Sequence, residues 1–367
     1  MSAPTPRSGI IDISPYKGGE SELEGQNDVI KLSSNENAFG PSPLAEAAYA
    51  QAASKLHLYP DGSYKRLREA IAKLHGLKPD RIICGAGSDE IISLLCLAYA
   101  GPGDEVLYSQ HGFLMYPISA KAVGAKPVFA KETDLTSDVD ALLEKVNSST
   151  RLLFLANPNN PTGTYLTEKK LRVLRQELPE NIILVIDAAY AEYATRTDYS
   201  PGIDLVENYE NVVMTRTFSK IYGLGGIRLG WAYCPKIITD ILNRVRGPFN
   251  VSSPAIEAGI AALSDSNFIN KTRTHNDTWL AWTYKEIIKL GLKAPKSAGN
   301  FILIQFPSGV DKSENMAESA NVFLKNRGII VRRMLAYGLP DCLRVSIGRE
   351  NEMKTTIGAL KEFIEKS

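Results

Sequence analysis

The chain has 367 residues, more than twice the roughly 150 of an average domain, and its 42 Lys and Arg against 41 Asp and Glu leave a formal charge of +1. A charge this close to zero argues against a nucleic-acid-binding protein or an electrostatic membrane binder, because both need a surface of one sign. The 44% of hydrophobic and 23% of charged residues are typical of a soluble globular protein that buries a sizeable core.

The first part of the chain, up to about residue 43, is rich in Gly, Ser, Asn and Pro and predicts an extended arm. Residues 64–75 follow with apolar side chains at helical spacing, and short apolar strands then alternate with helices. Strands that are apolar throughout imply a mostly parallel sheet covered on both faces. The predicted strands are 81–84, 105–108, 127–130, 152–155, 182–186, 212–215 and 229–233, and further helices are predicted at 89–100 and 167–177.

After about residue 248 the pattern changes to that of a smaller α+β domain. We therefore predict three parts: an arm (1–43), a large domain (44–247) and a small C-terminal domain (248–367). The elements predicted for the small domain are a long helix at 267–290, a strand at 300–305, a helix at 314–326, strands at 329–331 and 342–347, and a final helix.

The few cysteine and histidine residues predict neither a disulfide framework nor a metal site. The four cysteines lie far apart without C-x-x-C spacing, and the four histidines show no ligand spacing. Residues 1–9 are polar with no apolar run behind them, which argues against a secretory signal. The longest apolar stretch, 91–100, is far shorter than the roughly 18 residues of a membrane span. We therefore expect a cytoplasmic protein with no membrane partner.

One stretch, 217–230 (TFSKIYGLGGIRLG), combines groups that suit a phosphate-bearing ligand. Lys220 follows a strand and Ser219, and it leads into a glycine-rich loop that ends at Arg228. Taken singly, lysine and arginine are most often surface residues. Together, the glycines let the backbone approach a ligand closely, and the hydroxyl and the guanidinium supply donors that bind phosphate.

Three further segments follow predicted strands, at the edge where parallel sheets place their ligands. Residues 85–90 (GAGSDE) join a strand to a helix whose free N–H groups can hold an anion. Residues 157–163 (NPNNPTG) follow the predicted strand 152–155. Asp187 stands at the end of the predicted strand 182–186, and Tyr190 comes three residues later. Each segment has an ordinary explanation on its own, as a glycine turn, a proline-rich turn or a helix N-cap.

In this order and spacing, the four motifs resemble those of the fold-type I aminotransferases that use pyridoxal 5′-phosphate (PLP), the aspartate aminotransferase superfamily. The resemblance covers nearly the whole chain, and N-P-T-G, D-x-x-Y and S-K-x-x-G-x-x-G-x-R-x-G together are more specific than any one motif. It implies an α/β fold whose large domain binds PLP and holds a mostly parallel seven-stranded sheet between helices, followed by the smaller α+β domain.

The resemblance also implies catalytic roles for Lys220, Asp187 and Tyr190. Lys220 would attach the cofactor aldehyde if burial and a nearby arginine lower the pKa of its amine, and it would then act as general base and acid in a ping-pong transamination. Asp187 would stabilise the protonated pyridine nitrogen. Asn160 and Tyr190 would bind the 3′ oxygen of the ring, and Phe113 would stack on the ring or serve as a plain core residue. The implied phosphate partners are Ser88 and Asp89 through backbone amides, Thr217, Ser219, Arg228 and, from a second subunit, Tyr59.

A finer resemblance, to the histidinol-phosphate aminotransferases, rests on 32–43 (LSSNENAFGPSP), 59–62 (YPDG), 158–161 (PNNP) and 342–348 (CLRVSIG). It implies that L-histidinol phosphate and 2-oxoglutarate give imidazole-acetol phosphate and L-glutamate, a reaction of histidine biosynthesis. An arginine fork suits both a carboxylate and a phosphate, so Arg344 could serve both half-reactions. The implied substrate residues are Tyr16, which could equally be a packing anchor, Asn37, Asn160, Arg332 and Arg344.

Two positions depart from the commonest family pattern: Ala188 stands where Glu is usual, and Ala38 where Pro is usual. Two alternatives stay open: an aromatic amino-acid aminotransferase of the same fold, since imidazole and phenyl rings can share an apolar pocket, and a PLP lyase such as threonine-phosphate decarboxylase, which also binds an amine with a phosphate. A transcription regulator on this scaffold is disfavoured, because the segment before Ser33 is short and has no basic helical pattern. The family works as a homodimer, so we expect Tyr59 to reach the site of the partner subunit, and we expect no nucleic-acid partner.

Overall fold

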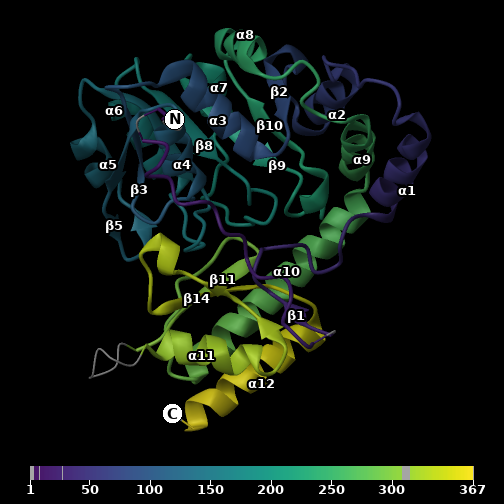
Figure 1. Cartoon of the computed structure of the whole chain (residues 1–367), viewed down its shortest axis with the longest axis vertical. Coiled ribbons are helices and arrows are strands. Elements are labelled where there is room, and N and C mark those ends of the chain that lie inside the picture. Colours follow the sequence, from purple (N-terminus) through teal and green to yellow (C-terminus); the bar gives the residue numbers. More distant parts are fainter. Residues whose placement is uncertain (1–3, 8, 27, 308–314, 367) are drawn as a thin grey trace.

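The computed structural model describes residues 4–7, 9–26, 28–307 and 315–366, and it divides into a larger α/β part and a smaller α+β part (Figure 1). A long helix, α10 (Ser266–Lys289), runs between them, and the N-terminal segment passes from the larger part to the smaller one. Among the residues described, no helix combines the length and the apolar character that crossing a bilayer requires.

The larger part is built on a seven-stranded sheet in the order β2-β10-β9-β8-β7-β3-β4. Only β10 runs antiparallel to its neighbours, with Gly230 opposite both Gly85 and Thr217. The predicted sheet and its mostly parallel direction are therefore confirmed. The strands are β2 (Ile82–Gly85), β3 (Glu105–Ser109), β4 (Lys126–Ala130), β7 (Thr150–Ala156), β8 (Ile183–Asp187), β9 (Val212–Thr217) and β10 (Gly230–Tyr233).

Helices cover this sheet because their apolar sides join its side chains in one hydrophobic core. Thr167 caps the first turn of α6 by accepting from the amide of Lys170. The covering helices are α1 (Pro43–Ala52), α2 (Lys65–His75), α3 (Ser88–Tyr99), α4 (Met115–Ala122), α5 (Val139–Lys145), α6 (Glu168–Glu177), α7 (Ile203–Asn208), α8 (Lys236–Val245) and α9 (Ser253–Ser264). A small hairpin, β5 (Glu132–Thr133) and β6 (Thr136–Ser137), lies beside them.

The smaller part has a three-stranded antiparallel sheet in the order β11-β14-β13 and its own hydrophobic core. The arm also contributes a strand to the smaller part. In a separate two-stranded sheet, β1 (Ile30–Lys31) pairs in parallel with β12 (Ile329–Ile330). Residue 314, the predicted start of one helix, lies outside the described residues. The other elements are β11 (Phe301–Gln305), α11 (Met316–Lys325), β13 (Arg332–Arg333), β14 (Cys342–Ser346) and α12 (Glu350–Lys366).

Helix α10 takes part in both cores. Ile269, near its start, packs in the larger core, and Ile287, near its end, packs in the smaller one. The side chains of α9 also pack in the larger core, so α9 goes with the sheet domain although it follows residue 247. The predicted boundary between 247 and 248 stays a prediction, while the change of core occurs within α10.

Candidate active site

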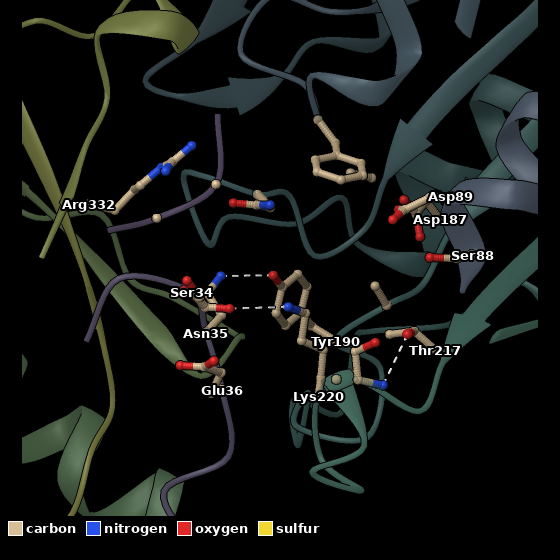
Figure 2. A pocket seen from close by; sticks show the side chains of 18 of the residues that line it. Ser34, Asn35, Glu36, Ser88, Asp89, Asp187, Tyr190, Thr217, Lys220 and Arg332 are labelled. Carbon is tan, nitrogen blue, oxygen red and sulfur yellow. Dashed lines mark hydrogen bonds between the residues drawn. The ribbon is translucent and has the colours of Figure 1, made fainter. Parts of the chain in front are cut away.

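A cavity of about 320 Å³ opens where strands β7, β8 and β9 end, between the two parts of the molecule. Ala156, Asp187 and Thr217, the last residues of these three strands, all line it. This is the edge of a parallel sheet at which ligands bind. The predicted site residues that line the cavity are Tyr16, Ser88, Asp89, Phe113, Asn160, Asp187, Tyr190, Thr217, Ser219, Lys220, Arg228, Arg332 and Arg344 (Figure 2).

Lys220 presents a partly buried amine to this cavity. Its Nζ donates one long hydrogen bond, 3.5 Å, to the carbonyl oxygen of Ser34, and lies 5.7 Å from the centre of the Tyr190 ring (Figure 2). Loss of water contact lowers the pKa of this amine to about 8, and the positive charge of Arg344 acts in the same direction. A neutral, nucleophilic amine is therefore available close to neutral pH.

Asp187 lies buried at the end of β8 and accepts two hydrogen bonds from side chains. The Tyr116 hydroxyl donates to Oδ2 over 2.8 Å, and the Thr215 hydroxyl donates to Oδ1 over 3.0 Å. Burial raises the pKa of the Asp187 carboxyl, whereas these two donors lower it because they favour the ionised form. The position suits a carboxylate that faces a positively charged group of a ligand.

The start of α3 and the loop after Lys220 form an anion-binding corner. No side chain caps α3, so its first amide groups remain open at Ser88, and the helix dipole adds partial positive charge. The Arg228 guanidinium lies 3.0 Å from Asp89 Oδ2 and 3.4 Å from Ser219 Oγ. The Thr217 hydroxyl accepts from the amide of Ser219 over 3.1 Å. Helix amides, hydroxyls and a guanidinium together suit a phosphate.

Two glycines make this corner possible. Gly87 has φ +86°, and a Cβ there would lie 2.5 Å from Arg228 Nη2. A Cβ on Gly230 would lie 2.3 Å from the backbone nitrogen of Ser88, which cannot move aside as a flexible side chain could. Glycine at these positions therefore lets β10 and the arginine approach the first turn of α3.

The aromatic ring of Phe113 lies between the cavity and Tyr116. Its ring meets that of Tyr116 edge-on, with centroids 5.9 Å apart and planes at 89°. Tyr116 in turn stacks on Phe154 at 4.8 Å. Phe113 both lines the cavity and packs on the core, so the structure is compatible with either predicted role.

Arg344, on β14, reaches the cavity from the smaller part. Its Nη1 donates to Asn160 Oδ1, and its Nη2 donates to the carbonyl oxygen of Ser33 over 2.9 Å. Its Nε is buried and has no hydrogen-bond partner within the described part of the chain. Phe301 lies beneath the guanidinium, 5.4 Å from ring centre to Cζ. Arg344 is thus a buried cation next to the amine of Lys220.

The arm passes over the open side of the cavity. Tyr16 lines it, and Arg332 holds the arm by donating to the carbonyl oxygen of Lys17 over 2.5 Å. Arg333, the next residue, points elsewhere and pairs with Glu318, as alternation along a strand requires. Arg332 therefore adds positive charge at the mouth of the cavity.

Two predicted site residues do not line the cavity of this chain. Tyr59 is 83% exposed and stacks on Phe249, with ring centres 4.8 Å apart. Asn37 uses its amide within the protein: Nδ2 donates to the carbonyl oxygen of Ile221 over 2.6 Å, and Oδ1 accepts from the amide of Phe39 over 2.9 Å. Asn37 thereby fastens the loop that follows Lys220.

Several residues at the cavity were not predicted as site residues. Ser34, Asn35 and Glu36 line it. They belong to the motif 32–43, which carried the family resemblance without indicating a role for these three residues. Tyr116, the second residue of α4 (Met115–Ala122), does not line the cavity but donates to Asp187 from behind it, and no local pattern marked it.

Proteins with known names resemble this chain over nearly its whole length. A family model described as aminotransferase class I and II matches residues 27–360. The chain is 56% identical over 364 residues, 99% of each chain, to a Paramagnetospirillum magneticum protein named histidinol-phosphate aminotransferase. It is 53% identical over 361 residues to one of that name from Rhodospirillum rubrum, covering 98% of this chain and 97% of the relative. The crystal structure of histidinol-phosphate aminotransferase from Sinorhizobium meliloti in complex with pyridoxal-5′-phosphate superimposes with a TM-score of 0.90 at 29% identity, covering 100% of this chain and 99% of that one.

Proposed function

Because the chain belongs to the aminotransferase class I and II family, we propose that it transfers the amino group of L-histidinol phosphate to 2-oxoglutarate with PLP as cofactor. The products are imidazole-acetol phosphate and L-glutamate. The observation that carries the proposal is full-length identity of 56% to a protein named for this substrate, together with a cavity that holds an amine, a carboxylate and an anion-binding corner.

The residues present fit this cofactor. The nucleophilic amine of Lys220, the buried carboxylate of Asp187 and the anion-binding corner at Ser88 all line one cavity of about 320 Å³. These are the three groups that an aldehyde, a protonated pyridine nitrogen and a phosphate require. Asn160 and Tyr190, which also line the cavity, would bind the ring oxygen.

Bound PLP supplies an electron sink that lets a proton leave the carbon bearing the substrate's amino group. Lys220 would take that proton at Nζ, and a pKa of about 8 suits this task because a group that titrates near the working pH can both accept and return a proton. Asp187 would remain ionised and would stabilise the positive charge of the pyridine nitrogen. The two hydrogen bonds that it accepts support this role.

The substrate's phosphate and the carboxylate of the second substrate would meet the same cationic wall. Arg344 offers a planar guanidinium, and its Nε–H, which has no partner among the described residues, could donate to an oxygen of the bound substrate. Arg332 and Tyr16, at the mouth of the cavity, would bind the outer end of the substrate.

We also propose a homodimer in which Tyr59 binds the cofactor phosphate of the partner subunit. Its exposed ring and the neighbouring exposed Phe249, Leu56 and Leu58 support an interface at this surface. A two-fold dimer is the commonest arrangement of identical chains.

A donor panel tests the proposed reaction. Purified protein with PLP is given L-histidinol phosphate, phenylalanine or threonine phosphate, with 2-oxoglutarate as the common acceptor, and glutamate formation is measured. We expect the highest kcat/KM with L-histidinol phosphate. A higher value with phenylalanine would instead identify an aromatic aminotransferase, and carbon dioxide release without need for 2-oxoglutarate would identify a lyase.

A variant pair tests the residue assignment in the same assay. Lys220→Ala should abolish both turnover and the absorbance of lysine-bound PLP, because no amine remains to attach the aldehyde. Lys73→Ala, on the exposed side of α2, is the matched control and should behave as the unaltered protein. Repeated turnover by Lys220→Ala would exclude this assignment.

A further inference from the structure

Asn35 lies buried between the two parts of the molecule and binds both. It is 1% exposed and has a left-handed backbone, with φ +54°. Its carbonyl oxygen accepts from Asn300 Nδ2 over 3.0 Å, and its amide N–H donates to Ser346 Oγ over 2.8 Å, both in the smaller part. Its side-chain Nδ2 donates to the hydroxyl of Tyr190, in the larger part, over 2.8 Å (Figure 2).

The contacts of Ser346 fix which way the Asn35 amide points. A backbone N–H can only donate, so Ser346 Oγ must accept from it, and the serine's own proton needs another acceptor. Asn35 Oδ1, 3.2 Å from Ser346 Oγ, is that acceptor. With Oδ1 used in this way, the Nδ2 group faces Tyr190 and can only donate to its hydroxyl.

This polarity leaves the proton of the Tyr190 hydroxyl free to point elsewhere. Tyr190 lines the cavity, and the amine of Lys220 lies 5.7 Å from the centre of its ring (Figure 2). We propose that Asn35 is a positioning residue that turns the Tyr190 hydroxyl proton into the cavity, toward the phenolic oxygen of the bound cofactor. The inference rests on the proposed function, since it needs PLP in this cavity.

Strand β14 would orient both residues that bind the phenolic oxygen of the cofactor, Asn160 and Tyr190. Arg344 and Ser346 are two residues apart on β14 and so project from the same face of the sheet. Arg344 contacts Asn160 directly, and Ser346 acts on Tyr190 through Asn35. A strand of the smaller part thereby orients two donors that the larger part supplies.

The proton's direction has a spectroscopic consequence. A donor on the phenolic oxygen of bound PLP would stabilise negative charge there, and it would therefore lower the pH at which the absorbance of the lysine-bound cofactor changes. Burial raises the pKa of Tyr190 to about 12, so its hydroxyl keeps the proton that it donates. If that proton turned away, the pH at which the cofactor absorbance changes would rise.

Asn35→Asp reverses the polarity with almost no change of shape. A carboxylate has no proton to give, so it accepts the Tyr190 proton and draws it out of the cavity. We expect the midpoint of the absorbance titration of the resting holoenzyme to rise by about one to two pH units, the effect of losing one hydrogen bond to a charged oxygen. Asn35→Gly, which suits φ +54°, is the matched truncation and should give a smaller, intermediate shift, because the Tyr190 hydroxyl is then free to rotate and donates inward only part of the time.

A second background separates the direction of the proton from the added charge. In Tyr190→Phe there is no hydroxyl to turn, so Asn35→Asp should add little to the shift that Tyr190→Phe causes alone. An equal shift of Asn35→Asp in both backgrounds would mean that the carboxylate acts by charge only, and equal shifts for Asp and Gly would mean a merely structural role. Either result overturns the inference. If the unaltered protein shows no lysine-bound absorbance, the proposed function fails instead.

Discussion

The amine of Lys220 lies in surroundings that favour its neutral form, and this has a cost in stability. Its pKa falls from 10.5 to about 8 in the folded protein, chiefly through lost hydration and then through Arg344. Between these two values the unfolded chain binds more protons than the folded one. The free energy of unfolding therefore rises as the pH rises through this window.

Replacing Lys220 by Met should stabilise the protein in the absence of PLP. At pH 7 the folded protein would no longer hold a poorly hydrated ammonium group, and we expect a gain on the order of 2 kcal/mol, discounted because the amine is partly exposed. The gain should shrink as the pH is raised above about 8, where the amine becomes neutral. Urea unfolding at pH 7 and pH 10 measures both. Lys73→Met, on the exposed side of α2, should change little, and a loss of stability in Lys220→Met at pH 7 would contradict the account.

Asp187 can be tested by removing its charge and keeping its shape. Asp187→Asn should lower kcat with L-histidinol phosphate by about a hundredfold or more, because a neutral amide no longer holds positive charge at the ring nitrogen. The absorbance of lysine-bound PLP should remain. Thr215→Val, which removes one of the two donors and leaves the carboxylate, should have a much smaller effect. A kcat within threefold of the unaltered value in Asp187→Asn would show that the ring partner lies elsewhere.

At the scale of elements, the first turn of α3 depends on its close contact with β10. Gly230→Ala should push the amide of Ser88 away, because the new Cβ would lie 2.3 Å from it. We expect the Kd for PLP to rise about tenfold or more, which corresponds to about 1.4 kcal/mol or more of lost binding free energy. Equilibrium absorbance titration measures it. Gly101→Ala, where a Cβ meets no atom within 4 Å, is the control, and equal affinities in the two variants would rule out this role for the contact.

The elements that the sequence predicted best are those with strong local patterns. The seven apolar strands and helices such as α2 and α6 were predicted, because burial imposes a period that short windows reveal. Strands β1 and β12 are two residues each, and their pairing joins Ile30 to Ile329, so only the folded chain reveals it. The alanine-rich helix α9 was missed for a different reason, because small side chains give little contrast between the buried and the exposed side of a helix.

The same division holds for the site. Asp187 ends a strand, Lys220 and Asn160 follow strand ends, and parallel strands bring such positions to one edge. Asn35 reaches the cavity through a backbone with φ +54° and through partners 155 and 311 positions away, so no local pattern marks its contacts. Tertiary pairing decides such positions.

At the scale of the whole molecule, exposed apolar side chains gather around Tyr59. Tyr59 is 83% exposed, Leu56 66%, Leu58 56% and Phe249 46%. Together they form an apolar surface of the kind that protein partners cover. This surface is the basis for the proposed dimer, in which each Tyr59 serves the other subunit.

Hybrid dimers test whether Tyr59 acts across the interface. Tyr59→Ala alone should bind PLP more weakly, and Lys220→Ala alone should be inactive. When the two variants are co-expressed, a mixed dimer would hold one site with Lys220 from one subunit and Tyr59 from the other. We expect glutamate formation at limiting PLP to exceed the sum of the two separate proteins. Activity no greater than that sum, with mixed dimers confirmed by mass, would place Tyr59 outside the neighbouring site.

The contact between Asn35 and Ser346 joins positions 311 residues apart. During synthesis, Lys220 therefore leaves the ribosome long before the strand that carries Arg344 and Ser346 exists. A nascent polypeptide can fold its first core as it emerges, but it has no means to orient Asn35 or Asn160. We therefore expect the cofactor site to be complete only in the full-length chain. A chain that ends before β14 should bind PLP more weakly.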